Sequence, residues 1–235
     1  MTSRRDQVPF DPRYYEKLAR SGRAFEADHA FRDIYRRHHW SGGESASGAG
    51  ASLDQTGELR RLLPALLTEL GVVTMLDLPC GDYGWMRTID LPVARYIGAD
   101  LLPEIVGPLA TALSAGGRRF RVLDLTRDRL PPADLLFCRD CLVHLSYADI
   151  RRALNNVVQS GIPYLLTTTF PDCEANEDIV TGDWRVLDLE RAPFHLPAPM
   201  RILNERCTEG GGMFADKSLG LWRTGDLRHL PFLGP

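Results

Sequence analysis

The chain has 235 residues, 44% of them hydrophobic, and a formal net charge of −3 at pH 7. A chain of this length and apolar content can bury a sizeable core, which excludes a wholly disordered protein and predicts one large domain, with or without a small appendage. The nearly balanced charge excludes the strong positive field of a dedicated nucleic-acid-binding protein.

The cysteines and the apolar stretches indicate the cellular compartment of the protein. Five cysteines, an odd number, are spread through the chain at positions 80, 138, 141, 173 and 207. This pattern argues against a disulfide framework and favours a reducing compartment. The start of the chain shows no apolar segment typical of an export signal, and the stretch LLPALLTELGVV is too short and too interrupted to cross a membrane. We therefore expect a cytoplasmic protein that does not bind a membrane.

The first 55 residues are expected to form an extension to the main domain. The spacing of apolar residues predicts helix within residues 1–40. The residues that set this spacing are Phe25, Phe31, Ile34 and Tyr35. The stretch SGGESASGAGAS (41–52) that follows is small, polar and rich in glycine, a composition typical of a flexible linker.

From residue 56 to residue 235 the sequence predicts an α/β domain. A helix is expected over 55–70, with Thr56 able to cap it and Gly71 after its end. Beyond it, short apolar runs alternate with helical segments, which predicts a doubly wound, mostly parallel sheet that is covered on both faces. The expected strands are residues 72–77, 95–99, 119–123, 134–138 and 162–169. The expected helices are residues 84–90, 103–114 and 146–160, the last of them capped by Ser146.

The last part of the chain completes this sheet. Residues 172–200 are irregular and contain three prolines, so we expect a loop-rich insertion there. The segments RILNERC (201–207) and DKSLGLWRT (216–224) are strand-like, and the glycines at 210–212 between them predict an antiparallel hairpin at the sheet edge. With this hairpin the sheet has seven strands.

The stretch LDLPCGDYG (76–84) follows the first predicted strand of the domain, at the turn where open parallel sheets bind their ligands. Gly81 would let the backbone approach a ligand closely, and Asp77 could hold an amino group. Two kinds of cofactor use such a turn, a dinucleotide and S-adenosylmethionine. Pro79, Gly81 and Gly84 match the glycine spacing of the dinucleotide fingerprint only imperfectly.

Two further acids at predicted strand ends separate these cofactors. Asp100 ends the second strand, where a carboxylate can accept bonds from both ribose hydroxyls, and Asp124 ends the third, where a carboxylate can read the amino group of adenine. Three strand-end acids suit a ligand with an ammonium group, a ribose and an adenine. Asp77 and Asp82 would instead repel a pyrophosphate at a helix N-terminus that ought to attract anions.

On these residues the chain resembles the class I S-adenosylmethionine-dependent methyltransferases, roughly over residues 56–223. Asp77 matches the acid of the family's first motif, Gly81 fills one of its glycine positions, and Pro79 and Tyr83 replace the other two glycines. The two further strand-end acids match the family's ribose and adenine positions. The segments WSGGESASGAG, LDLPCGDYGWM, CRDCLVHLS, TTTF and DKSLGLW resemble a bacterial subgroup of the family, which implies no particular acceptor.

The resemblance implies a Rossmann-like fold and S-adenosylmethionine as cofactor. It suggests that the Gly/Ser-rich segment folds over the cofactor as a lid, with Trp40 over an apolar part and Ser47 near the methionine end, while the linker interpretation stays equally open. Arg139 could face the cofactor carboxylate, although a surface ion pair is as common a fate. The residues expected to contact the cofactor are Trp40, Ser47, Asp77, Pro79, Cys80, Gly81, Asp100, Leu101, Asp124, Leu125 and Arg139.

The segment CRDCLVHL (138–145) closes the fourth predicted strand, where such methyltransferases present catalytic groups. Methyl transfer needs alignment of donor and acceptor and, for hydroxyl acceptors, removal of a proton. His144 is the first expected base because imidazole titrates near neutral pH, and Asp140 is the second, as a base or as a group that orients an acceptor amine. A His144 that only packs in the interior is an equally open interpretation. No metal site is expected, because Cys138 and Cys141 lack a second closely spaced pair elsewhere.

The expected acceptor is a small polar molecule, such as a sugar, an amino acid derivative or a specialised metabolite, methylated on oxygen or nitrogen. The chain lacks the Asn/Asp-Pro-Pro-aromatic motif of enzymes that methylate nucleic-acid bases. Residues of the insertion expected to bind the acceptor are Asn176, Asp178, Trp184, Arg185 and His195. Ordinary loop packing is the alternative for each of them. An NAD(P)-binding oxidoreductase, a non-catalytic cofactor-binding partner and a homodimer also stay open.

Overall fold

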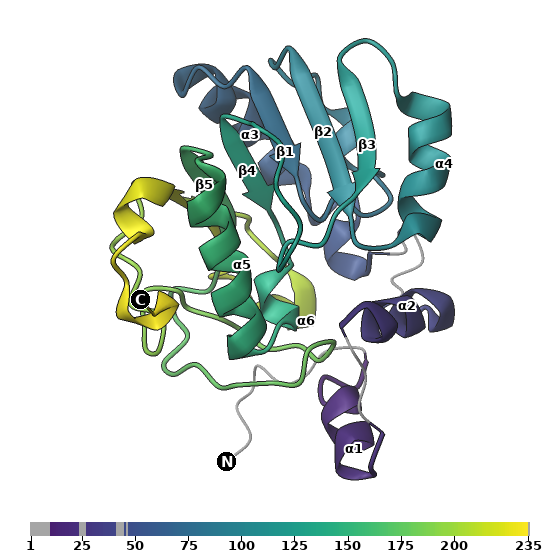
Figure 1. Cartoon of the computed structure of the whole chain (residues 1–235), viewed down its shortest axis with the longest axis vertical. Helices are drawn as coiled ribbons and strands as arrows, with labels where there is room; N and C mark the ends of the chain where they lie inside the picture. Colours follow the sequence, from purple (N-terminus) through teal and green to yellow (C-terminus); the bar gives the residue numbers. More distant parts are fainter. Residues whose placement is uncertain (1–9, 24–26, 41–44, 46, 235) are drawn as a thin grey trace.

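The computed structural model describes residues 10–23, 27–40, 45 and 47–234, and a seven-stranded sheet forms its centre (Figure 1). The strands are β1 (Thr74–Asp77), β2 (Arg95–Asp100), β3 (Arg118–Val122), β4 (Leu135–Cys138), β5 (Tyr164–Thr169), β6 (Arg201–Asn204) and β7 (Ser218–Arg223). Their order in the sheet is β3-β2-β1-β4-β5-β7-β6. Strands β1 to β5 run parallel, and β7 is antiparallel to both of its neighbours. The doubly wound, mostly parallel sheet with an antiparallel terminal hairpin is therefore confirmed.

Helices cover both faces of the sheet, and neighbouring strand residues alternate between two cores. Met75 packs on one face with α3 (Gly57–Glu69) and α4 (Pro103–Leu113). Leu76, the next residue, packs on the other face with α5 (Tyr147–Ser160). Because both faces are covered, successive residues of a central strand are all buried, which explains why these strands are continuous apolar runs in the sequence.

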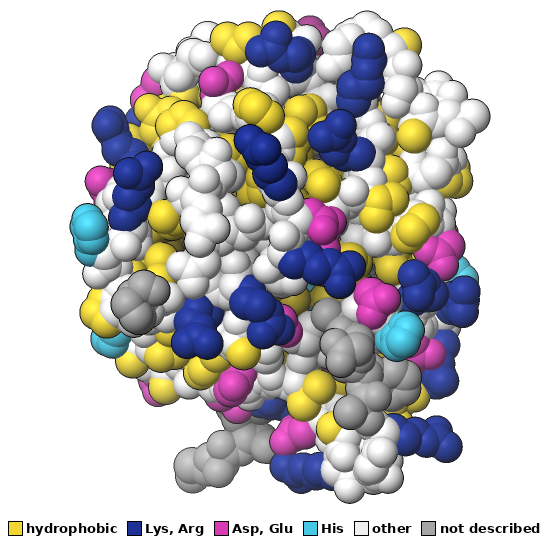
Figure 2. Space-filling model, viewed as in Figure 1, with side chains coloured by type: hydrophobic (Ala, Val, Ile, Leu, Met, Phe, Trp, Pro, Cys, Tyr) yellow, Lys and Arg dark blue, Asp and Glu magenta, His cyan; other side chains and the backbone are white. Residues whose placement is uncertain are grey.

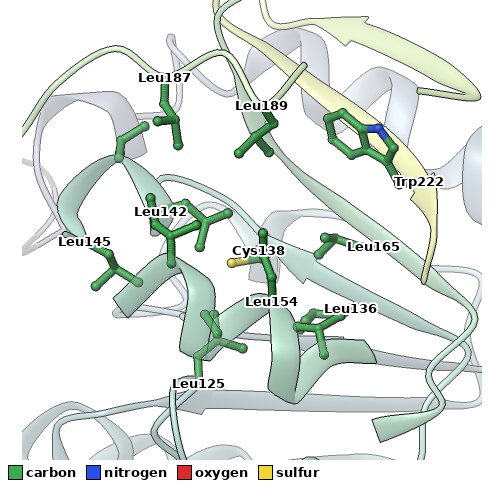
Figure 3. Close-up of a cluster of buried hydrophobic side chains, with 14 of the residues drawn as sticks. Leu125, Leu136, Cys138, Leu142, Leu145, Leu154, Leu165, Leu187, Leu189 and Trp222 are labelled. Carbon is green, nitrogen blue, oxygen red and sulfur yellow. The ribbon is translucent and has the colours of Figure 1, made fainter. Parts of the chain in front are cut away.

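Part of the second core lies beneath α5 (Figure 3). Leu136 and Leu165 from the sheet lie together with Leu154 of α5, and burial of each leucine contributes about 1.5–3 kcal/mol to folding. Leu187 and Leu189 pack into the same core, although the segment after β5 that carries them contains neither a helix nor a strand. This irregular segment therefore covers part of the sheet in place of a helix.

One predicted helix is wrong. Residues 84–90 form only a single 3₁₀ turn, Met86–Thr88. Just before it, Tyr83 has a φ of +59°, and the carboxylate of Asp82 accepts the N–H of Gly84 at 2.9 Å. Such a local bond from an Asp side chain competes with the start of a helix.

The two predicted helix caps differ in outcome. Ser146 caps α5 as expected, since its Oγ accepts the N–H of Asp149 at 3.2 Å. Thr56 stands at the start of α3, but its hydroxyl donates to the carbonyl of Ser52 at 2.8 Å and caps nothing. Its predicted capping role is therefore wrong. Phe25, one of the apolar residues used to predict the N-terminal helices, lies outside the described residues.

Two N-terminal helices, α1 (Tyr14–Arg20) and α2 (Ala27–Arg37), confirm the helix expected in the first 40 residues. Figure 1 shows α2 beyond the arrowheads of β1, β2 and β3. The Asp183 carboxylate accepts the N–H groups of Tyr15 and the following residue at 2.7 and 2.9 Å, and the Tyr15 hydroxyl donates to the Ala30 carbonyl at 3.0 Å. The extension is thus fastened across the end of the sheet at which α/β proteins bind ligands.

The surface carries mixed charges, and the helices are short or polar. On the face drawn in Figure 2, Lys and Arg side chains are spread among acidic and apolar ones. Within the described ranges, no helix combines the length and apolar character needed to pass through a bilayer.

Candidate functional site

A cavity of about 700 Å³ lies at the carboxyl ends of β1 to β4, and residues of the N-terminal extension complete its wall. This size is within the range typical of small-molecule sites. We call its two parts the acidic half and the aromatic half. The acidic half comprises the turn after β1 and the acids Asp77, Asp100 and Asp124. The aromatic half comprises Phe31, Ile34, Trp40, His144, Phe170, Trp184 and Phe214.

The turn after β1 packs closely against the Gly/Ser-rich segment. Gly81 has a φ of +53°, which glycine adopts without strain, and a Cβ at this position would lie 2.2 Å from Ser47 Oγ. Ser45 Oγ donates to the Asp82 carboxylate at 2.7 Å. Residues 47–51 line the cavity. These contacts favour the lid interpretation of the segment over the linker interpretation.

Asp77 is a buried carboxyl group beside a second buried acid. Its Oδ2 accepts the hydroxyl of Tyr96 at 2.5 Å, and the Asp100 carboxylate accepts the N–H groups of Leu102 and Gly81 at 3.1 and 3.3 Å. Burial, with repulsion from Asp100, raises the pKa of Asp77 to about 8 against the lowering effect of the Tyr96 bond. Burial also raises the pKa of Asp100 to about 6. A positively charged ligand in this half would stabilise both ionised carboxylates.

Asp124 lies at the third corner of the acidic half. Its Oδ1 accepts the N–H and the hydroxyl of Thr126 at 2.8 and 2.6 Å, and its Oδ2 lies 3.2 Å from Nε of the exposed Arg127. These bonds orient the carboxylate after β3. Other residues predicted to contact a cofactor also line the cavity, namely Pro79, Cys80, Leu101 and Leu125.

His144 ends the 3₁₀ turn that follows β4 and lies in the wall of the aromatic half. Its Nδ1 lies 3.0 Å from the carbonyl oxygen of Asp183. Because a carbonyl can only accept, Nδ1 carries the proton and the lone pair of the neutral ring is on Nε2. Burial lowers the pKa of His144 to about 4, so the ring is neutral at pH 7. The Trp40 ring stacks on it with centroids 4.1 Å apart.

Trp40 therefore lies beside the expected base. Its Nε1 is buried and has no hydrogen-bond partner within the part of the chain that the structure describes. The sequence predicted Trp40 over an apolar part of the cofactor, whereas the structure places it in the aromatic half with its ring on His144. Its buried indole N–H is therefore a donor that no described group accepts.

The guanidinium of Arg139 is occupied by protein groups. Its Nε and Nη2 form two bonds with the Glu205 carboxylate at 3.1 and 2.7 Å, and Nη2 also donates to the Gly50 carbonyl at 2.9 Å. The two charged side chains are only 6% and 1% exposed. Such a buried two-bond pair holds the guanidinium in place. Arg139 lines the cavity and also ties the Gly/Ser-rich segment to the sheet, so its contact with a cofactor carboxylate stays a prediction.

Asp140, the second expected base, is held in its ionised form. Lys217 Nζ donates to its Oδ2 at 2.7 Å, and Arg139 Nη1 lies 3.2 Å from the same oxygen. Burial alone would raise the pKa of Asp140, but the two cations outweigh burial and hold this pKa well below its usual range. A carboxylate with so low a pKa accepts protons poorly. The geometry therefore favours His144 over Asp140 as the base.

The structure separates the five residues predicted to bind the acceptor. Trp184 lines the aromatic half, but the other four do not line the cavity. Asn176 Nδ2 donates to the carbonyls of residues 188 and 192 at 2.7 and 2.8 Å, and Asp178 accepts the N–H of residue 147 at 2.7 Å. Arg185 donates to the carbonyls of residues 142 and 145, both at 2.7 Å, and His195 is exposed. For these four residues the prediction is not supported, because the side chains of Asn176, Asp178 and Arg185 bond to the backbone and His195 lies on the surface away from the cavity.

Sequence reasoning missed several residues of the site. Tyr96 reads as an ordinary core aromatic of β2, and Phe170 and Phe214 belong to no periodic pattern that points to the cavity. Lys217 could have been noticed from the sequence, because it is one of only two lysines in an arginine-rich chain. Its ammonium group lines the cavity wall beside Asp140.

No cluster of three or more His, Cys, Asp or Glu side chains among the described residues is arranged to hold a metal ion. Cys138 and Cys141 are free thiols, and the hydrogen bond of the Cys141 thiol to Cys138, together with burial, raises the pKa of Cys141 well above its usual value. The Cys141 thiol is therefore not activated as a nucleophile.

No protein-family model and no curated protein matches the chain. Solved structures do match. Human N-acetylserotonin methyltransferase in complex with S-adenosylmethionine (SAM) is similar with a TM-score of 0.58 and 17% identity over 90% of this chain, which spans 62% of that enzyme. The N-methyltransferase NodS from Bradyrhizobium japonicum WM9, in complex with S-adenosylhomocysteine, has a TM-score of 0.54 and 15% identity over 83% of this chain and 97% of its own. The chain has the fold of the class I methyltransferases, as the sequence predicted.

Proposed function

We propose that the chain is a SAM-dependent methyltransferase that acts on an oxygen or nitrogen atom of a small polar molecule. The observation that carries the proposal is the acidic half of the cavity. Asp77, Asp100 and Asp124 follow three adjacent parallel strands and line one cavity together with the turn at Gly81. The class I methyltransferase fold, and the SAM and S-adenosylhomocysteine bound by two proteins that share it, support the same function.

The residues of the acidic half fit this cofactor. Two buried carboxyl groups with raised pKa values, Asp77 and Asp100, favour a cation and disfavour a phosphate, because a phosphate would add a like charge. The ammonium group of SAM would be held by Asp77, its ribose by Asp100 and its adenine by the Asp124 side. Because Gly81 has no side chain, a ligand can lie directly against the backbone of the turn. A Cβ at this position would also collide with Ser47.

SAM supplies a methyl group on a positively charged sulfur. The chain's own residues must then align the acceptor, exclude water and remove a proton from it. His144 can perform the last task, because its Nδ1 proton is held by the Asp183 carbonyl and its Nε2 lone pair is free to accept. Trp40 and the rings of the aromatic half exclude water around this nitrogen.

Calorimetry with S-adenosylhomocysteine and, separately, with NAD⁺ tests the proposal. We expect S-adenosylhomocysteine to bind and NAD⁺ not to bind. Asp100→Asn should weaken the binding about tenfold or more, the loss expected when one buried charged hydrogen-bond acceptor is removed. The exposed Asp226→Asn is the matched control and should bind like the unmodified protein.

The alternatives predict different results. Binding of NAD⁺ without binding of S-adenosylhomocysteine would contradict the proposal and favour an oxidoreductase. Binding of S-adenosylhomocysteine by a protein that transfers no methyl group to any acceptor that occupies the aromatic half would favour a non-catalytic partner protein.

A further inference from the structure

We propose that the acceptor is a planar aromatic molecule with a hydroxyl group, held among the rings of the aromatic half with its hydroxyl against His144. This inference rests on the proposed methyltransferase function and narrows its acceptor. The polar residues that suggested a sugar, Asn176, Asp178 and Arg185, bond to backbone groups outside the cavity.

Three mutually perpendicular rings form one part of the wall. The centroids of Trp184 and Phe214 lie 5.3 Å apart at an interplanar angle of 80°. Phe170 lies 6.3 Å from Phe214 and 6.4 Å from Trp184, at angles of 78° and 89°. Edge-to-face packing of this kind holds the rings rigidly and leaves ring faces and edges toward the cavity, where another flat ring packs favourably.

The N-terminal extension adds a second group of rings. Phe31 of α2 lies edge-on to Trp40 with centroids 6.0 Å apart, and Trp40 in turn stacks on His144. All three line the cavity. The expected base is therefore set in an aromatic surface, which suits an acceptor whose reactive oxygen is attached directly to a ring.

Few polar atoms in this half are free to bind an acceptor. Trp40 Nε1 is a buried donor with no partner in the described ranges, and His144 Nε2 is an acceptor for which the structure shows no bond. Lys217 and Asp140, which also line the cavity, are bonded to each other, and the Glu209 carboxylate beside them accepts the Cys207 thiol. The indole donor and the imidazole acceptor belong to two stacked rings, which suits an acceptor with one hydroxyl group on a ring. A sugar would bury several hydroxyls without partners, each at a cost in binding free energy.

The proton transfer agrees with this acceptor. A buried imidazole with a lowered pKa is a weak base, and a phenolic hydroxyl, with a pKa of about 10, is far more acidic than an alkyl hydroxyl, which resembles water at about 15.7. In the transfer, the phenolic oxygen forms a bond to the methyl carbon, the electron pair of the broken carbon–sulfur bond stays on sulfur, and the hydroxyl proton moves to His144 Nε2. The products are an aryl methyl ether, a neutral thioether and a protonated His144.

Ligand-observed NMR with the protein saturated in S-adenosylhomocysteine tests the proposal. The probes are 2-naphthol, its saturated counterpart decahydro-2-naphthol, and methyl glucoside. We expect 2-naphthol to bind about tenfold more tightly than the saturated ring, the ratio that one good contact between aromatic rings produces, and methyl glucoside not to bind. Equal binding of both bicyclic alcohols, no binding of 2-naphthol, or binding of methyl glucoside alone would overturn the proposal.

Two variants connect this binding to the aromatic half. Phe214→Leu should weaken 2-naphthol about tenfold and leave the affinity for S-adenosylhomocysteine unchanged, which also shows that the variant is folded. Phe232→Leu changes a ring that packs on Phe194 away from the cavity, and it should alter neither affinity. If Phe214→Leu binds 2-naphthol normally, the proposal fails. If the unmodified protein does not bind S-adenosylhomocysteine, the methyltransferase function itself is rejected.

Discussion

Trp40 and His144 stack with ring centroids 4.1 Å apart, although one follows α2 and the other follows β4. The stacking brings the N-terminal extension onto the expected base and removes water from one face of its ring. Burial of this kind is the main reason for the lowered pKa of His144. The extension is thus part of the cavity wall beside the proposed base as well as a cover for it.

His144→Asn tests the proton transfer. The Asn amide can still donate to the Asp183 carbonyl, as Nδ1 does in the native protein, but it cannot accept a proton. We expect turnover of a hydroxyl acceptor to fall by about 10²–10⁴-fold, the usual contribution of a positioned base. The affinity for S-adenosylhomocysteine, measured by calorimetry, should not change. Normal turnover in this variant would reject His144 as the base.

Asp77 should release a proton when the cofactor binds. In the ligand-free protein its pKa of about 8 keeps it mostly protonated at pH 7, and a bound ammonium group would favour the carboxylate and lower that pKa. Binding of S-adenosylhomocysteine at pH 7 should therefore release about one proton. Calorimetry in buffers with different ionisation enthalpies measures this number. Asp77→Asn should abolish the release, and a binding enthalpy in the native protein that does not depend on the buffer would argue against contact between Asp77 and the ligand.

The same carboxyl group should make the ligand-free protein less stable as the pH rises from 6.5 to 8. The pKa of Asp77 is about 8 in the folded protein and about 3.9 in an unfolded chain, so its contribution to stability is full below pH 4 and is lost as the pH rises through 8. Below pH 6.5 two effects oppose each other, because the raised pKa of Asp100 acts in the same direction and the lowered pKa of His144 acts in the other.

Above pH 6.5 only Asp77 among these three groups still titrates in the folded protein. The free energy of unfolding, measured by urea denaturation, should fall by about 1–2 kcal/mol between pH 6.5 and 8. In Asp77→Asn this slope should disappear. A stability that stays constant or rises across this interval in the native protein would show that Asp77 is ionised before any ligand binds.

Glu205→Gln should destabilise the protein strongly, because it removes the fully buried carboxylate that forms two bonds with the Arg139 guanidinium and leaves only the partly exposed Asp140 as its counter-charge. Loss of one partner of a buried ion pair costs about 3–5 kcal/mol. Urea denaturation should show this loss, and the double variant Arg139→Met/Glu205→Leu should recover part of it. Glu69→Gln is the matched control. It breaks the pair with Arg201, whose side chains are 45% and 54% exposed, and such exposed pairs contribute about 1 kcal/mol or less. Equal losses in the two single variants would contradict the structural role of Arg139.

The acidic half was predictable from the sequence, and the aromatic half only in part, through Trp40, His144 and Trp184. Apolar runs separated by helical segments predict a parallel sheet, and in such a sheet the residues that end neighbouring strands meet at one edge. Asp77, Asp100 and Asp124 could therefore be placed together from their positions alone. Phe31 and Phe214 come from segments whose place over the sheet depends on tertiary contacts, so no local pattern distinguishes them from core residues.

Four of the five residues predicted to bind the acceptor do not line the cavity, for a related reason. In a segment without helix or strand, the backbone N–H and C=O groups need partners, and polar side chains nearby supply them. Asn176 and Arg185 do this, with bonds to carbonyl groups at 2.7–2.8 Å. Sequence composition cannot distinguish a polar side chain that supports a loop from one that faces a ligand.

The N-terminal extension has its own small core of Tyr15, Ala30 and Ile34, separate from the two cores on the sheet. It nevertheless provides Phe31 and Trp40 to the aromatic half of the cavity. The carboxyl groups of the acidic half come from the strand ends. Changes in these helices can therefore alter which molecules fit without disturbing the folding of the sheet. Exchange of this extension between related proteins would therefore change the proposed acceptor specificity. The residues proposed to bind SAM would stay the same.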